Sequence, residues 1–83
     1  MIADEFDEIL TILSEECAEL TIACSKIRRF GSAENHANLV QEMADVATLV
    51  VTLKEFMNIS DKEFEAATTA KLNKLSRYSS INL

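Results

Sequence analysis

Residues 14–20, Ser-Glu-Glu-Cys-Ala-Glu-Leu, place three carboxylates on neighbouring turns of a predicted helix. Two of them, Glu16 and Glu19, are three residues apart and therefore share one helix face. A second acidic pair with the same spacing, Glu42 and Asp45, falls in the middle of the most apolar segment of the chain. We expect the remaining sequence to bring these two acidic turns face to face.

Length and composition limit what the chain can be. Its 83 residues predict a single domain spanning 1–83, and 48% of them are hydrophobic. Three helices cannot hide that much apolar surface within one small chain, so we expect a homo-oligomer to complete the core. The net charge of -6 argues against nucleic-acid binding. No apolar run reaches the length of a membrane span, and no signal peptide is expected.

Three helices follow from the capping and turn signals. The first is predicted from Asp4, a good N-cap, to Phe30, with Gly31 ending it in a positive-φ conformation. The second is predicted to run to about Met57, capped by Asn35 or Ser32. Ser60-Asp61-Lys62-Glu63 is a capping box, which starts a third helix that ends near Tyr78.

The two long helices each carry an apolar row whose spacing alternates between three and four residues, as in helices that pack on one another. The row of the first helix is predicted as Phe6, Leu10, Leu13, Cys17, Leu20, Cys24 and Ile27. The row of the second is predicted as Leu39, Met43, Val46, Val50, Leu53 and Met57, beside Val40, Ala44, Ala47 and Val51. In the third helix we expect Phe64, Thr68, Leu72 and Leu75 to face inward. The predicted fold class is therefore all-α. A long antiparallel helix pair and a third helix would form a four-helix-bundle-type core by oligomerisation.

Cys17 and Cys24 lie too far apart on one helix for an intrachain disulfide, about 10.5 Å at 1.5 Å per residue. We expect both to be buried thiols in a reducing cytoplasm.

The acidic pairs predict a metal site. If the two rows pack together, Glu16, Glu19, Glu42 and Asp45 converge, and such like charges repel unless they are protonated or bind a cation. Oxygen ligands favour Mg²⁺, with Mn²⁺ as the other choice, and such an ion would bind substrate phosphates and polarise water. A di-iron bundle would need Glu-x-x-His pairs. The single histidine, His36, has Ala33 three residues before it, which argues against that class.

The combination Glu15-Glu16-x-x-Glu19 and Glu42-x-x-Asp45, 22 residues further on, resembles the EExxE…ExxD signature of the MazG-like all-α nucleoside triphosphate pyrophosphohydrolases. The resemblance covers nearly the whole chain. It extends through Ser25-Lys26 and Arg29-Phe30-Gly31 to a closing basic segment, residues 71–78.

The resemblance implies Mg²⁺-dependent hydrolysis of a nucleoside triphosphate between its α- and β-phosphates, giving the monophosphate and pyrophosphate. It implies that the metal ligands are Glu16, Glu19, Glu42 and Asp45. Glu15 would hold a second metal or orient the attacking water. Substrate contacts are expected from a set of polar and basic residues: Lys26, Asn38, Lys71, Lys74 and Arg77. It also implies a dimer or tetramer whose site is completed by helices from more than one chain.

The sequence departs from the family in two places. Leu75 stands near the position where many members carry Asn, with Asn73 as a substitute, and Trp is absent. Base stacking would therefore fall to Phe30, Phe56 or Tyr78. These departures keep open an alternative function, a catalytically silent helical oligomer that binds a nucleotide or a protein partner.

Overall fold

The computed structural model describes residues 4–83, and within them the chain consists of three α-helices and no strands. Helix α1 spans Glu5–Phe30, α2 spans His36–Phe56 and α3 spans Asp61–Tyr78. The predicted all-α class and the three helix boundaries are confirmed to within a residue or so. None of the helices in the described range is both long and apolar enough to cross a membrane.

The helix ends follow the predicted capping chemistry in most places. The Asp4 carboxylate accepts from the Asp7 N–H at 2.8 Å, and the Ser60 hydroxyl accepts from the Glu63 N–H at 3.1 Å. Gly31 ends α1 with φ at +88°, a value that glycine adopts without steric cost. The prediction for Asn35 is only half right. It occupies the N-cap position of α2, but its side chain donates to the Gly31 carbonyl at 3.0 Å and makes no capping bond.

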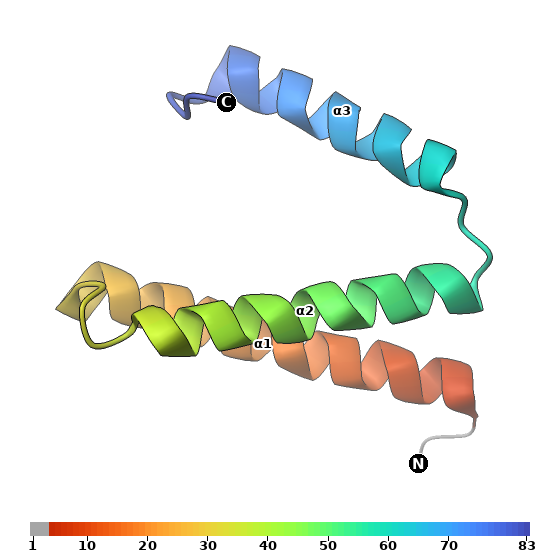
Figure 1. The fold of residues 1–83 in the computed structure, drawn as a ribbon, viewed down its shortest axis with the longest axis horizontal. Coiled ribbons are helices and arrows are strands. Elements are labelled where there is room, and N and C mark those ends of the chain that lie inside the picture. The colour runs from red at the N-terminus through yellow and green to blue at the C-terminus, as the bar shows by residue number, and fades with distance from the viewer. Residues whose placement is uncertain (1–3) are drawn as a thin grey trace.

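Helices α1 and α2 lie side by side and antiparallel, joined by a short turn (Figure 1). The packed row on α1 differs from the predicted one at three positions, because Ile9, Glu16 and Ala23 replace Leu10, Cys17 and Cys24. Ile9 is 7% exposed and Ala23 only 1%, whereas the three predicted residues are exposed. At the end of the pair, the Phe6 and Phe56 rings stack with centroids 5.6 Å apart.

The predicted row of α2 is shifted in the same sense. Leu39, Val46, Val50 and Leu53 are half-buried as expected. Met43 and Met57 are exposed instead, and Glu42 takes the half-buried position beside Met43. The predicted second row is also exposed at all four positions: Val40, Ala44, Ala47 and Val51. A change of one residue turns the contact row by about 100° around the helix. Small Ala23 at the contact allows α1 and α2 to approach closely, which favours the observed row. The expectation that the two thiols are buried is therefore wrong for the single chain.

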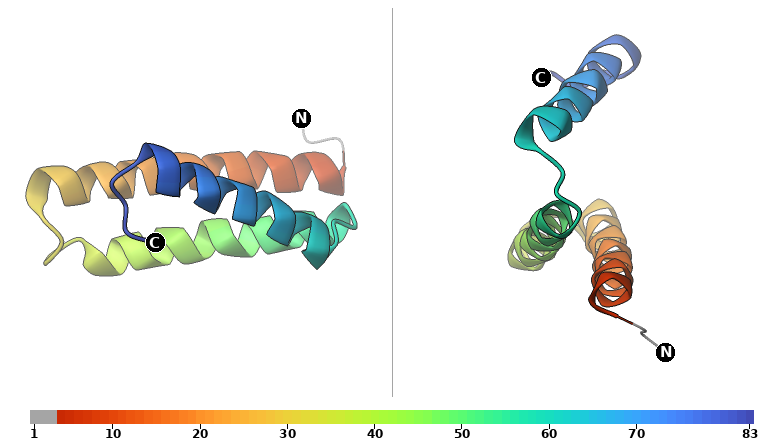
Figure 2. Two further views of the ribbon diagram at one scale, coloured as in Figure 1. Left: turned by 90° about the horizontal axis from the view of Figure 1, so that it is seen from above. Right: turned by 90° about the vertical axis from the view of Figure 1, so that its right-hand side faces the viewer.

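Helix α3 diverges from the pair and packs on neither helix (Figures 1 and 2). Its predicted inward row is largely exposed: Phe64, Thr68 and Leu72 face solvent, and Leu75 alone is half-buried. The reason is that the turn at Asn58, whose φ is +56°, directs α3 away from α1 and α2. The chain thus presents one helix pair and a separate third helix.

Candidate metal centre

The two acidic turns meet where α1 and α2 pack against each other. Glu16, Glu19 and Glu42 each offer a carboxylate oxygen, and these three oxygens lie within 4.8 Å of one another. Glu16 and Glu42 are half-buried and Glu19 is exposed at the edge of the group. The convergence predicted from the two helical spacings is therefore present in a single chain for these three residues.

Glu16 and Glu42 each bury one oxygen that has no partner. Within the described residues, the Oε2 atoms of both side chains are shielded from solvent and accept no hydrogen bond. Leaving a buried carboxylate oxygen without a donor is costly, so such atoms usually accompany a proton or a cation. Both orphaned oxygens belong to the carboxylates that the shifted rows bring into the helix contact.

The pKa values of the cluster respond to this placement. Desolvation raises the pKa of Glu16 first, followed by repulsion from Glu19, Asp45 and Glu42. Desolvation likewise raises the pKa of Glu42 first, and the negative charges of Glu19 and Asp45 raise it further. These effects require four carboxylates in close proximity. Asp45, which is half-buried, therefore lies close to this group, although it is not one of the three carboxylates whose oxygens lie within 4.8 Å of one another.

The remaining predicted residues on α1 and α2 lie around this group. Lys26 is exposed, and its positive charge lowers the pKa of Glu42, against the effect of the neighbouring carboxylates. Lys26 therefore lies near the cluster. Asn38 is exposed two turns before Asp45 and, counted around the helix, on the same side of α2. Glu15 is exposed and rotated about 100° from Glu16, so it lies outside the three-oxygen group.

The basic residues of α3 do not reach the cluster within one chain. Lys71, Lys74 and Arg77 are exposed on a helix that does not pack on α1 or α2. The Arg77 guanidinium lies 5.4 Å from the centroid of the neighbouring Tyr78 ring. The structure therefore assembles the acidic half of the predicted site but leaves its basic segment apart.

The donor set fits a hard divalent cation. The four carboxylates would bring it only oxygen ligands, which Mg²⁺ and Mn²⁺ prefer over sulfur or imidazole donors. A cation would also satisfy the two orphaned oxygens and offset the mutual repulsion that raises both pKa values. A cation held by these carboxylates would in turn attract phosphate groups.

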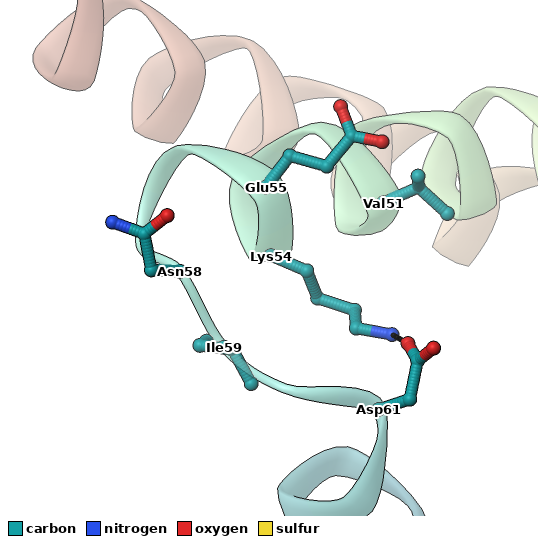
Figure 3. Close-up of a pocket in the computed structure, with 6 residues that line it drawn as sticks. All are labelled: Val51, Lys54, Glu55, Asn58, Ile59 and Asp61. Carbon is teal, nitrogen blue, oxygen red and sulfur yellow. Dashed lines mark hydrogen bonds and ion pairs between the residues drawn. The ribbon is translucent and has the colours of Figure 1, made fainter.

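A second polar site, absent from the sequence interpretation, lies at the turn between α2 and α3. A cavity of about 430 Å³ is lined by Val51, Lys54, Glu55, Asn58, Ile59 and Asp61 (Figure 3). Lys54 Nζ pairs with Asp61 Oδ1 at 3.2 Å and lies 4.3 Å from the centroid of the Phe64 ring. In the sequence, this site is indicated only by Lys54 near the end of the second predicted helix and Asp61 at the start of the third.

Comparison with protein-family models, curated proteins and solved structures finds no significant match to this chain.

Proposed function

We propose that this protein is a Mg²⁺-dependent nucleotide pyrophosphohydrolase that cleaves (d)NTPs between the α- and β-phosphates. The observation that carries the proposal is the four-carboxylate group on α1 and α2, with two buried oxygens that lack partners. The resemblance of both acidic motifs to the MazG-like signature supports the same reaction. In this reaction, water adds across the α–β anhydride and releases a monophosphate and pyrophosphate.

Glu16, Glu19, Glu42 and Asp45 would hold the cation. A bound Mg²⁺ supplies charge neutralisation of the phosphates and polarisation of water. The half-buried positions of Glu16 and Glu42 fix those two side chains against the helix contact, so the ligand set is partly preorganised. Glu15, on the exposed flank of the cluster, is our choice to orient the attacking water or to hold a second metal.

The acidic cluster needs a source of positive charge for the leaving pyrophosphate. Lys26 is the basic residue whose charge already acts on the cluster, and Asn38 lies on the same side of the pair. Lys71, Lys74 and Arg77 would contribute from α3 of another chain in a homo-oligomer, because α3 stands apart in its own chain. We place this activity in the cytoplasm, where exposed thiols such as Cys17 stay reduced.

Pyrophosphate release from a panel of (d)NTPs, measured with Mg²⁺ and with Mn²⁺, tests the proposal. We expect turnover of at least one nucleotide and none in the presence of a chelator. Circular dichroism on the same sample verifies that the chain is helical. No turnover of any nucleotide by a folded sample would overturn the proposal.

A second candidate function is a silent oligomer that binds a nucleotide or a protein partner without cleavage. The separation of Lys71, Lys74 and Arg77 from the carboxylates is the observation that favours it. Calorimetry distinguishes the two functions, since the silent protein would bind a nucleotide whose concentration then stays constant.

A further inference from the structure

Contacts between α1 and α2 fix the register of the helix pair. Three pairs of residues define it: Phe6 with Phe56, Glu16 with Asp45, and Glu19 with Glu42. From each pair to the next, α1 advances by as many residues as α2 retreats, to within one. The same register sets Ile9 next to Thr52 and Ile12 next to Leu49. It therefore determines which side chains follow the carboxylates along the pair.

A small cavity lies along the pair from the carboxylates, on the side that carries Glu19 and Asp45, here called the acidic side. Five residues line this cavity of about 280 Å³, here called the Phe56 cavity: Glu5, Ile9, Thr52, Glu55 and Phe56. Thr52 and Phe56 fall on the same side of α2 as Asp45 when counted at 3.6 residues per turn. Thr52 follows Asp45 by seven residues, so the two lie about 10.5 Å apart along the helix axis. A nucleotide with its phosphates at the carboxylates can reach this far with its base.

The two ends of the acidic side differ in charge. Toward the turn between α1 and α2, the positive charge of Lys26 acts on the cluster, so phosphate groups are attracted there. In the other direction, the half-buried apolar side chains of Ile12 and Leu49 come first, followed by Glu5 and Glu55 at the Phe56 cavity. These carboxylates repel phosphates. A nucleotide bound at the cluster would therefore direct its triphosphate toward Lys26 and its base toward the Phe56 cavity.

Phe56 gives the cavity an aromatic surface on which a base can stack. Its ring stacks on Phe6 at an interplanar angle of 10° and is still 43% exposed, so part of the ring is free for a second planar group. The other exposed aromatic rings each lie close to a lysine or arginine cation: Phe30, Phe64 and Tyr78. Stacking holds any base, because every base has a flat π-face. The choice among bases must therefore come from the polar groups around the ring.

The polar side chains of the Phe56 cavity accept hydrogen bonds but have no proton to offer. The Thr52 hydroxyl already donates to the Thr48 carbonyl at 2.9 Å. Carboxylates such as those of Glu5 and Glu55 are acceptors only, and within residues 4–83 neither takes part in an ion pair. Glu55 extends away from the ion pair at the turn between α2 and α3 (Figure 3). A base is therefore selected here by the donors that it presents.

Guanine is the base whose donors match this cavity. Its ring N–H and its exocyclic amino group lie side by side and can bind both oxygens of one carboxylate. Adenine and cytosine offer an amino group beside a ring nitrogen that only accepts. Uracil and thymine place one N–H between two carbonyl oxygens, which a carboxylate repels.

We propose that the Phe56 cavity is a nucleobase subsite that selects guanine nucleotides. The carboxylates of Glu55 and Glu5 accept from the base, and the Phe56 ring stacks on it. This selection rests on the proposed function of the acidic cluster, which holds the phosphates of the same nucleotide. Glu55 and Glu5 are thus specificity-determining residues.

Calorimetry with nucleoside monophosphates tests the subsite without any turnover. In the presence of Mg²⁺, we expect GMP to bind on the order of ten-fold more tightly than UMP, as for one bidentate contact to a base. IMP lacks the exocyclic amino group and should fall between them. Each compound is measured in its ribose and its deoxyribose form. Equal affinity for the three bases, or no binding of GMP in either form, overturns the proposal.

Glu5→Gln/Glu55→Gln identifies the side chains responsible, and Glu34→Gln/Glu65→Gln is its matched control. All four glutamates are exposed, and both double variants change the net charge equally, but Glu34 and Glu65 do not line the cavity. An amide cannot accept from two neighbouring donors at once. The first variant should therefore lose the preference for GMP over IMP and UMP, whereas the control should keep it. Equal loss in both variants, or a preference kept in both, overturns the assignment.

Hydrolysis of GTP, ITP and UTP, in the ribose and deoxyribose forms, separates this proposal from the proposed function. We expect kcat/KM to decrease from GTP to ITP to UTP and the differences to disappear in Glu5→Gln/Glu55→Gln. Hydrolysis of all three at equal kcat/KM overturns the guanine subsite and leaves the activity in place. Preferential binding of GMP without hydrolysis of any triphosphate supports the subsite and overturns the activity.

Discussion

The α1·α2 pair has an acidic side, which carries Glu19 and Asp45, and an apolar side, which carries Cys17 and Met43; counted at 3.6 residues per turn, the two lie on opposite flanks of the helix contact. On α1, Glu16 lies in the helix contact while its neighbour Cys17 is exposed, and on α2 the same is true of Glu42 and Met43. The helix contact therefore contains two carboxylates in positions that apolar side chains could occupy. A pair of helices selected for stability alone would do the reverse, and this difference supports the proposal that the carboxylates bind a cation.

The largest expected effect comes from removing a charge on the acidic side. Glu19→Gln keeps the size of an exposed side chain but replaces one of the three clustered carboxylates by a neutral amide. We expect pyrophosphate release to fall by a factor on the order of 10²–10³, as for loss of one preorganised electrostatic group. Helix content by circular dichroism should stay unchanged.

Glu8→Gln is the matched control for that substitution. Glu8 is also exposed on α1, three turns before Glu19, and is not part of the clustered group. It should retain full activity. Equal loss in the two variants, or loss of helix content in Glu19→Gln, would assign Glu19 a structural role instead.

A complementation experiment asks whether the two halves of the site come from different chains. Glu19→Gln removes the acidic half, and the double variant Lys74→Gln/Arg77→Gln removes part of the basic half. If α3 acts across a dimer, mixing equal amounts restores intact sites only in mixed dimers, to about a quarter of all sites. Pyrophosphate release after unfolding and refolding the mixture measures this recovery. If activity stays at the level of the separate variants, α3 of the other chain does not contribute.

Much of the fold was predictable because its signals are local. Asp4, Gly31 and Ser60 end or begin helices through contacts with residues at most four positions away, and each behaves as predicted. The capping function of Asn35 was mispredicted because its side chain donates a hydrogen bond to the Gly31 carbonyl in the preceding turn.

The contact rows were not predictable to the same degree. On α1 the predicted and observed rows share Phe6, Leu13, Leu20 and Ile27 and differ only on one flank. Periodicity predicts the row with more apolar residues, whereas in the structure the row that contains Glu16 and Ala23 lies in the helix contact. The convergence of Glu16, Glu19 and Glu42 was still predicted, since i, i+3 carboxylates on both helices lie near the contact in either register. The position of α3 depends on contacts that local sequence patterns do not encode.

Metal binding should affect the stability of the acidic side with a definite pH dependence. Folding raises the pKa of Glu16 above its usual 4.5. The folded chain therefore holds a proton that the unfolded chain releases. This contribution is fully present below about pH 4.5 and is lost as the pH rises through the folded pKa. Without metal, thermal stability should fall over that range. Mg²⁺ should restore it more at pH 7 than at pH 5, because it binds ionised carboxylates.

Differential scanning fluorimetry with chelator and with Mg²⁺ measures this response. We expect Mg²⁺ to raise the Tm at pH 7 by about 4–8 °C for each kcal/mol of binding energy in a domain this small. Glu16→Gln removes one charge from the cluster, so it should raise the Tm without metal and weaken the response to Mg²⁺. A chain whose Tm ignores both Mg²⁺ and Mn²⁺ at pH 7 would not contain the proposed centre.

The smallest effect is expected outside the acidic side, at the Lys54–Asp61 ion pair, which lies at the turn where α3 leaves the helix pair. Lys54→Met keeps an unbranched side chain of nearly the same length but removes the 3.2 Å ion pair and the cation over the Phe64 ring. Asp61 is almost fully exposed, so the loss should amount to only about 0.2–1 kcal/mol in urea unfolding. The loss should shrink further at 1 M salt.

Lys62→Met controls for the change in net charge, because Lys62 is an exposed lysine in the same first turn of α3. If Lys54→Met also lowers dimer affinity while Lys62→Met does not, the pair orients α3 for the partner chain. If neither does, the turn at Asn58 alone sets the direction of α3.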